Sequence, residues 1–117
     1  MAQPQPTLEW IDSHTHLEHD YPFSVDEYLT KSREAGIKTF VTIGTRPESL
    51  EKLRDFSEKY PDVFFTVGIH PHESKDYTDQ VEATMQALQS HAKCVGVGEI
   101  GLDYYYNHST KEQQAQA

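Results

Sequence analysis

Three short polar clusters hold the residues whose types and spacing could do chemistry. They are residues 12–16 (DSHTH), 68–72 (GIHPH) and 98–103 (GEIGLD), and each follows an apolar run of the sequence. Imidazole and carboxylate groups are common protein ligands of divalent ions such as zinc and manganese. The clusters therefore indicate a metal site, provided that the fold brings them to one place.

The first cluster has the spacing of a chelate. In an extended segment, side chains two residues apart point the same way, so His14 and His16 would present two imidazoles to one point. The alternative is a pair of solvated surface histidines in a loop, because so short a pattern is common by chance.

The other two clusters are weaker when each is taken alone. His70 and His72 flank Pro71, and a proline turn with two solvated histidines explains them equally well. Glu99 ends a strongly apolar run, where an unpaired carboxylate would be costly. Either a cation or an Arg or Lys from elsewhere in the chain must compensate it.

The elements that position these clusters are predicted to be four strands. Apolar, β-rich runs lie at residues 8–12, 37–43, 63–69 and 94–100. The last three runs are nearly continuous, as in parallel strands that are buried on both faces. Helical patterns separate the runs, so the expected order is β-α-β-α-β-α-β with a parallel sheet and right-handed crossovers.

The helix boundaries have local signals. Ser24 with Glu27 predicts a capping box, and Gly36 ends that helix. Pro47 should begin the second helix and Thr78 should cap the third. Ser109 or Thr110 should cap a fourth helix near residue 117.

Parallel strands carry active sites at their carboxyl ends, so the first and third clusters should share one rim. His14, His16 and Glu99 would then form a mixed nitrogen and oxygen site for Zn, Mn or Mg. The remaining isolated histidines are expected to be surface residues; they are His19, His91 and His108.

The composition limits the class of protein. A net charge of −9 disfavours a module that grips nucleic acid through a basic surface, but it is compatible with a nuclease whose metal ions supply positive charge. The single cysteine, Cys94, excludes an internal disulfide. No apolar run spans a membrane and the amino terminus does not look like a signal peptide, so a cytoplasmic setting is expected.

Together the clusters resemble a known family. DSHTHL at 12–17, GIHPH at 68–72 and GEIGLDYYY at 98–106 are similar to the signatures of TatD-related metal-dependent hydrolases. The resemblance runs from Trp10 to the end of the chain and implies a TIM-type (β/α)₈ barrel with two divalent ions. It further implies that the intact protein cleaves phosphodiester bonds of DNA by a two-metal mechanism.

The resemblance also implies roles for individual residues. His14 and His16 would bind one ion, and Glu99 would be the catalytic carboxylate that bridges both. His70 and Asp103 would support the ligands from behind or contact the phosphate.

The chain departs from the family in length. A (β/α)₈ barrel needs about 250 residues and eight strands, whereas 117 residues supply four strands. We therefore expect a flexible segment at residues 1–9 and a truncated, amino-terminal half barrel at residues 10–117. The family's remaining ligands, two histidines and an aspartate, have no counterpart. The half barrel alone should therefore be inactive, and it should either self-associate through open sheet edges or fold poorly.

Two other functions stay open. Strand-end histidines on a barrel also occur in amidohydrolase-like enzymes that cleave C–N or ester bonds. The chain as given could instead be a non-catalytic fragment or an assembly partner.

Overall fold

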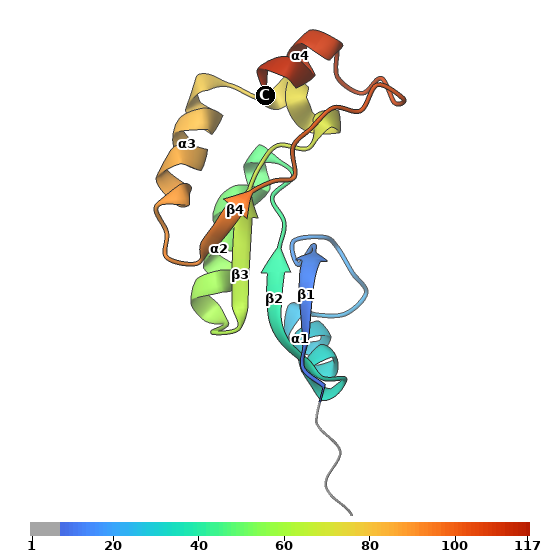
Figure 1. Ribbon diagram of the computed structural model, residues 1–117, viewed down its shortest axis with the longest axis vertical. Coiled ribbons are helices and arrows are strands. Elements are labelled where there is room, and N and C mark those ends of the chain that lie inside the picture. The colour runs from blue at the N-terminus through green and yellow to red at the C-terminus, as the bar shows by residue number, and fades with distance from the viewer. Residues whose placement is uncertain (1–7) are drawn as a thin grey trace, which may run out of the picture.

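The computed structural model describes residues 8–117. Four strands alternate with helices along this part of the chain (Figure 1). The strands are β1 (Trp10–Thr15), β2 (Ile37–Thr42), β3 (Val63–Val67) and β4 (Cys94–Val97). The helices are α1 (Val25–Glu34), α2 (Leu50–Lys59), α3 (Asp79–Gln89) and α4 (Lys111–Gln116), with 3₁₀ turns η1 (Pro47–Ser49) and η2 (Pro71–Asp76).

The strands form one parallel sheet in the order β1-β2-β3-β4. All four arrows point the same way in Figure 1, so the segments after their carboxyl ends lie at one edge. The alternating β and α order and the parallel pairing predicted from the sequence are confirmed. Sequential order of parallel neighbours is the arrangement found in successive units of a (β/α)₈ barrel.

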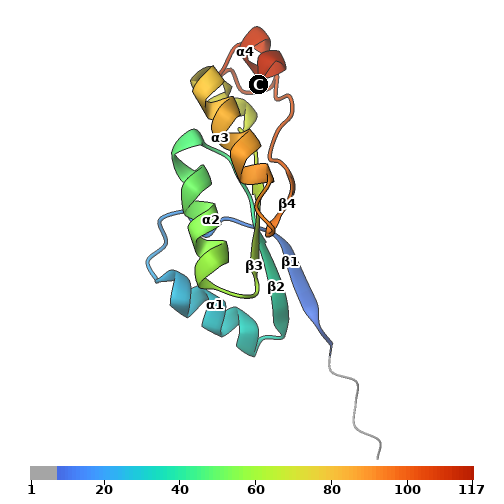
Figure 2. The ribbon, with the colours of Figure 1, turned by 90° about the vertical axis from the view of Figure 1, so that its left-hand side faces the viewer.

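The helices cover only one face of the sheet. Figure 2 shows α1, α2 and α3 on the same side of the strands, with α2 packed against β3. Two apolar clusters fill this interface. One is built from Leu50, Leu53, Phe65, Val67, Ile69 and Leu88, and the other from Leu17, Leu29, Phe40, Tyr60 and Val63.

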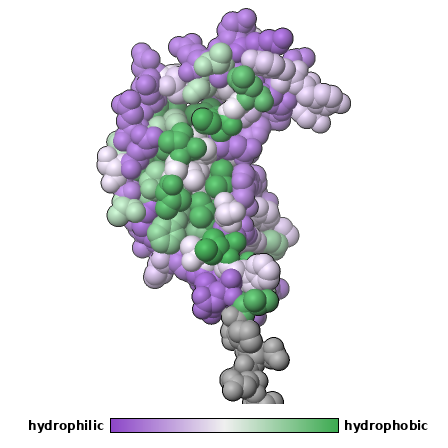
Figure 3. All heavy atoms as spheres, in the orientation of Figure 1, coloured by the Kyte–Doolittle hydropathy of each residue, from purple (hydrophilic) through white to green (hydrophobic). Residues whose placement is uncertain are grey.

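The opposite face of the sheet is uncovered within residues 8–117. Figure 3 looks onto this face and shows apolar side chains gathered in its middle. The large apolar residues of the two outer strands are more than half exposed; they are Trp10, Ile11, Val95 and Val97. In a closed barrel, the corresponding face of the sheet packs into the barrel interior.

Helix starts follow the local signals with two changes. At the first helix only the Ser24 half of the expected capping box is present. The hydroxyls of Ser24, Thr78 and Thr110 accept the backbone N–H groups of Glu27, Val81 and Gln113, respectively. These side-chain caps satisfy N–H groups that have no partner inside the helix. At the second helix, Pro47 begins a 3₁₀ turn, and the α-helix itself begins at Leu50.

The strand boundaries differ from those predicted, most of all at β1 and β4. β2 and β3 end at Thr42 and Val67, and not at residues 43 and 69. The first strand was expected at residues 8–12 but lies at Trp10–Thr15, because the polar residues of the DSHT segment continue the pairing with β2. The fourth was expected to reach Ile100 but ends at Val97. Glu99 therefore lies just beyond its strand and not within it.

Two positively charged side chains donate hydrogen bonds that connect elements at the amino-terminal side of the sheet. The Arg33 guanidinium donates two hydrogen bonds of 2.8 Å to the Asp62 carboxylate, which joins the end of α1 to the start of β3. The Lys93 ammonium donates to the backbone carbonyls of Ser57, Tyr60 and Pro61. Lys93 thus fastens the segment before β4 to the end of α2.

Part of the expected flexible segment, residues 1–7, lies outside the described residues. Cys94 is a free thiol, half-buried, and burial raises its pKa. Among residues 8–117, no helix has the length and apolar content needed to cross a membrane.

Candidate metal centre

The candidate site begins with the backbone at the carboxyl rim. The Glu99 N–H donates to the Gly44 carbonyl at 2.7 Å, and the Gly98 N–H donates to the Val67 carbonyl at 2.8 Å. The Thr66 hydroxyl also donates to the Gly98 carbonyl, at 2.6 Å. The segment after β4 therefore folds over the ends of β2 and β3, and this fold brings Glu99 above the middle of the sheet.

Gly68 makes this approach possible. A Cβ placed on Gly68 would lie 2.3 Å from the carbonyl carbon of Gly98 and 2.7 Å from the Glu99 nitrogen. Such separations are too short for any side chain, so the backbone could not stay where it is. A glycine is needed at 68 because two backbones approach each other there.

The structure brings His14, His16 and Glu99 together, although residues 14 and 99 are far apart in sequence. One ligand atom from each residue lies within 4.8 Å of the others. The distance from His14 Nε2 to Glu99 Oε2 is 3.5 Å, and the two imidazole rings are 5.0 Å apart. The three side chains thus converge on one point at the carboxyl rim.

The spacing and the donor types fit a divalent ion. A 3.5 Å separation is longer than a good N–H···O hydrogen bond. Two ligands of a tetrahedral ion, each about 2.1 Å from it, lie roughly 3.4 Å apart. Two imidazoles and a carboxylate also match the ligand types of zinc and manganese sites.

His70 lies on the other side of Glu99. Its Nε2 is 3.5 Å from Glu99 Oε1, while its Nδ1 accepts the His72 N–H at 3.1 Å. Because Nδ1 accepts that bond, the neutral ring carries its proton on Nε2 and can donate it to an oxygen. Burial lowers the pKa of His70, with the nearby Glu99 carboxylate partly opposing that effect.

Asp103 is paired with a histidine as well. Its Oδ2 lies 2.8 Å from His72 Nε2, and its Oδ1 accepts the N–H groups of Tyr105 and Tyr106. The hydrogen bond to His72 is the largest cause of a lowered pKa at Asp103. Asp103 therefore orders its own loop and holds the His72 ring, and it is not in the group formed by His14, His16 and Glu99.

The histidine and glutamate side chains described above, but not that of Asp103, line one hollow of about 400 Å³. Its lining contains five of the described histidines and Glu99, together with Arg46, Thr45 and Glu73; the histidines are His14, His16, His19, His70 and His72. The Thr45 hydroxyl is buried and has no hydrogen-bond partner among the described residues. Arg46 thus contributes a positive charge to the lining of this hollow, and its guanidinium lies 4.0 Å from the Glu48 carboxylate.

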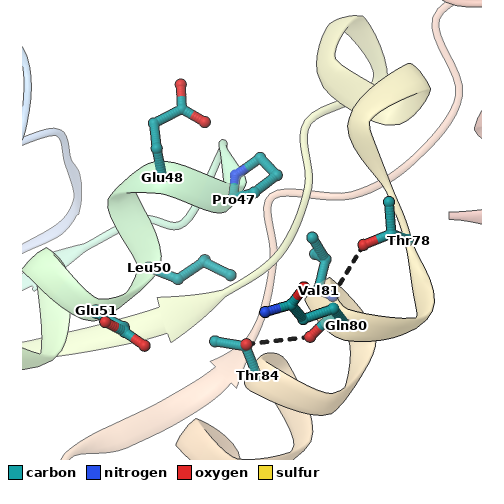
Figure 4. A pocket seen from close by; sticks show the side chains of 8 residues that line it. All are labelled: Pro47, Glu48, Leu50, Glu51, Thr78, Gln80, Val81 and Thr84. Atoms are coloured by element: carbon teal, nitrogen blue, oxygen red, sulfur yellow. Dashed lines mark hydrogen bonds between the residues drawn. The ribbon is translucent and has the colours of Figure 1, made fainter.

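A hollow of similar size, about 430 Å³, lies between the starts of α2 and α3 (Figure 4). Its two hydroxyls form hydrogen bonds with the backbone of α3. Thr78 accepts the Val81 N–H, and Thr84 donates to the Gln80 carbonyl. Its two carboxylates, Glu48 and Glu51, point in different directions. Size alone therefore does not distinguish the two hollows, but the convergence of ligand groups does.

Several residues of the site were missed from the sequence. His19 was expected to be an isolated surface histidine but lines the hollow, and Arg46, Thr45 and Glu73 were not considered. His72 was treated with His70 as part of a turn, yet it holds Asp103. Glu18 was not considered, although its side chain is only 4% exposed and lies 3.6 Å from His16 Nδ1. A carboxylate directly after a buried leucine in the HTHLE segment was the available signal.

Comparison with known proteins supplies independent information. Residues 11–117 match the model of the family described as TatD related DNase. The chain is 36% identical over 92 residues to a Cronobacter sakazakii protein named 3'-5' ssDNA/RNA exonuclease TatD, covering 79% of this chain. It is 28% identical over 105 residues, 89% of this chain, to a Bacillus subtilis protein named uncharacterized metal-dependent hydrolase YabD.

A solved structure has the same fold over most of this chain. The crystal structure of YjjV, a TatD homologue from Escherichia coli, superimposes with a TM-score of 0.75 and 32% sequence identity over 91% of this chain. The chain spans only 35% of the Cronobacter protein, 41% of the Bacillus protein and 42% of the YjjV chain.

Proposed function

Because this chain belongs to the TatD-related DNase family, we propose that it forms the first half of a metal-dependent nuclease barrel that cleaves phosphodiester bonds of DNA. The observation that carries the proposal is the convergence of His14, His16 and Glu99 within 4.8 Å at the carboxyl rim of a parallel sheet. The Cronobacter relative is named as an exonuclease on ssDNA and RNA, which supports the substrate class.

His14 and His16 would hold one divalent ion, and Glu99 would hold that ion and bridge to a second one. Ions bound there would stabilise charge on the phosphate oxygens and lower the pKa of a nearby water molecule. The identity of the ions, Mg, Mn or Zn, is left open by the donor set.

His70 and Arg46 would act on the phosphate directly, and Asp103 would act through His72. His70, with its proton on Nε2, can donate to Glu99 or to a phosphate oxygen. Arg46 lines the same hollow and can pair with the phosphate charge. Asp103 would keep the His72 ring and the loop after β4 in place.

The acidity of the chain supports a role for the ions in binding. A net charge of −9 would repel a polyanion, so the attraction must come from the site itself. Bound cations are often the largest local charges of a site. Nucleic acid as substrate and a free cysteine that needs no oxidising compartment both suit a cytoplasmic enzyme.

The test uses the chain alone and in a chimaera. Residues 10–117 would be joined to the part of the Cronobacter relative that follows its matched segment. With Mn²⁺ and end-labelled single-stranded DNA, we expect no turnover by the chain alone and clear turnover by the chimaera. Glu99→Ala or His14→Ala should abolish the chimaera's turnover, with circular dichroism showing an unchanged fold.

Asp103→Asn serves as the graded comparison. Because Asp103 acts through His72 and its own loop, its replacement should lower turnover by about 10–100-fold and not abolish it. A panel of amides and esters is assayed in parallel. A folded chimaera that hydrolyses those bonds but not DNA would support the amidohydrolase-like alternative, and wild-type turnover in Glu99→Ala would disprove the bridging role.

A further inference from the structure

A buried carboxylate next to the candidate metal centre has no role in the function proposed above. Glu18 lies in the loop after β1, and its side chain is only 4% exposed. Among residues 8–117, no Lys or Arg pairs with it; the charged or titratable partners within 4 Å are His16 and His19. A carboxylate buried this deeply needs compensation, because its desolvation is costly.

The position of Glu18 is fixed from the sheet side. Its Oε2 faces the Thr42 hydroxyl of β2 at 3.5 Å, and that hydroxyl accepts the Leu17 N–H at 3.2 Å. Thr42 is fully buried and Leu17 belongs to the core. The Thr42 hydroxyl of β2 therefore contacts both the Glu18 carboxylate and the backbone of the preceding residue.

The other oxygen of Glu18 faces His16. Glu18 Oε1 lies 3.6 Å from His16 Nδ1, and both atoms are buried without a hydrogen-bond partner among the described residues. A small approach of the two groups would satisfy both atoms at once. An N–H···O bond between them would require an oxygen acceptor and a protonated Nδ1.

We propose that Glu18 is a positioning residue that accepts a hydrogen bond from His16 Nδ1–H and thereby leaves Nε2 of that ring free to bind an ion beside His14 and Glu99. The identity of His16 as a ligand rests on the proposed function, whereas its Nδ1–H tautomer does not. A carboxylate behind a ligating imidazole fixes the ring orientation and makes the ring a stronger donor.

The charges of the two groups reinforce each other. An ion on Nε2 withdraws electrons from the ring and makes Nδ1–H a better hydrogen-bond donor to the carboxylate. The ion in turn stabilises the carboxylate, because it supplies a positive charge that no Lys or Arg among residues 8–117 supplies. Binding of the ion and burial of Glu18 therefore support each other.

His19 offers a competing arrangement. Its Nε2 is 3.5 Å from Glu18 Oε1, and His16, Glu18 and His19 also have ligand atoms within 4.8 Å of one another. An ion there would use Nδ1 of His16, so that one imidazole would face two cations. The His19 ring is instead stacked on the His16 ring at 4.6 Å and 6°, which suits a ring that shields the pair from solvent.

The first readout is the tautomer of His16 in the metal-free chain. Long-range ¹H–¹⁵N spectra at pH 8 should show the proton on Nδ1, with the His16 signals identified by their loss in His16→Gln. Glu18→Met has a similar shape but no acceptor, and the proton should move largely to Nε2. Glu18→Gln keeps an acceptor oxygen and should keep the Nδ1–H tautomer.

The second readout is Zn²⁺ affinity, measured by calorimetry on the same 117-residue chain. Glu18→Met should weaken binding by about 10–100-fold and Glu18→Gln by less. The matched control is Glu58→Gln, because Glu58 is an exposed carboxylate 3.2 Å from His91 Nε2 and remote from the site. That control should leave the affinity unchanged.

The outcomes separate the two proposals. A chain that binds no Zn²⁺ would count against the proposed function, while the tautomer would still decide the role of Glu18. An unchanged His16 tautomer in folded Glu18→Met would overturn the inference. A second bound Zn²⁺ ion that is lost in His19→Ala would also overturn it. If Glu18→Met does not fold, two other results would contradict the inference. One is an Nε2–H tautomer of His16 in the wild-type chain, and the other is an unchanged Zn²⁺ affinity in Glu18→Gln.

Discussion

The two middle strands and the two outer strands of the same sheet have very different surroundings. Phe40 of β2 and Phe65 of β3 are fully buried, whereas Trp10 of β1 and Val97 of β4 are more than half exposed. Yet the outer strands lead into the candidate ligands, His14 and His16 at β1 and Glu99 after β4. The middle strands contribute the backbone on which Glu99 rests.

This difference indicates that β2 and β3 provide most of the stability, whereas β1 and the segment after β4 provide the candidate ligand groups. The packed core lies between β2, β3 and the helices, so it does not depend on what covers the outer strands. The ligand groups depend on the outer strands and on close backbone contacts at Gly44 and Gly68. Substitutions in the middle should therefore change stability, and substitutions at the rim should change metal binding.

The largest effect is expected in the middle of the sheet. Phe65→Ala removes a fully buried ring from the core formed with Leu50 and Leu53, and should lower the free energy of unfolding by about 3–5 kcal/mol. Urea unfolding followed by circular dichroism measures this change. Trp10→Ala, at an exposed position of β1, is the control and should cost far less; equal losses would contradict the contrast between the strands.

A smaller effect, at the point where both regions meet, is expected for Gly68→Ala. The added Cβ would press on the backbone of Gly98 and Glu99, which costs about 1–3 kcal/mol of stability. It should also displace Glu99 and weaken Zn²⁺ binding measured by calorimetry. Gly96→Ala is the matched control, since its Cβ would meet only the Thr66 methyl at 3.8 Å; the idea fails if both variants bind Zn²⁺ as the wild type does.

The exposed outer strands should drive self-association of the isolated chain. An unpaired strand edge and an apolar face both favour association. A Val95→Lys and Val97→Lys double variant should raise the dissociation constant at least tenfold, about 1.4 kcal/mol, in sedimentation equilibrium. Gln86→Lys on the exposed side of α3 controls for added charge, and a wild-type chain that stays monomeric would refute the prediction.

The smallest effect is expected at the amino-terminal side of the sheet, far from the rim. The Arg33 hydrogen bonds lower the pKa of the Asp62 carboxyl below its usual value of 3.8. The resulting stability is present above the unfolded pKa and is lost as the pH falls through the lower folded pKa. Asp62→Asn should cost less than about 1 kcal/mol at pH 7, because the pair is partly exposed.

That cost should shrink as unfolding is repeated at pH values that fall progressively below 3.8, because the folded wild-type carboxyl becomes protonated only as the pH passes through its lowered pKa. Asp55→Asn provides the control for removing an exposed negative charge. A difference between Asp62→Asn and the wild type that grows in acid would contradict the direction of the pKa change.

The order of elements could be predicted from the sequence because the buried strands and capped helices leave local patterns. IKTFVT and VFFTV are rich in β-branched and aromatic residues. Ser24 and Thr78 each stand directly before the helix that they cap. The end of β1 could not be predicted in this way. Its last residues are polar, and only pairing with β2 keeps them in the strand.

The convergence of His14, His16 and Glu99 followed from placing three clusters at the ends of parallel strands. The roles of Glu18 and His72 did not, because both depend on contacts between residues whose rotamers the sequence does not specify. Glu18 is buried only because Thr42 and His16 lie on either side of it. Neither contact has a periodic pattern that sequence analysis could detect.

The hydrogen bond from Glu99 N–H to the Gly44 carbonyl also has a consequence for the order of events during synthesis. His14 and His16 leave the ribosome first, and Gly44 and Gly68 follow, but Glu99 can reach its place only after β4 pairs with β3. Glu99 is the last of these residues to leave the ribosome, and domains generally fold as units. The three ligand groups therefore come together only after the strands have paired. An ion can be bound by all three groups only in a chain whose sheet is already assembled.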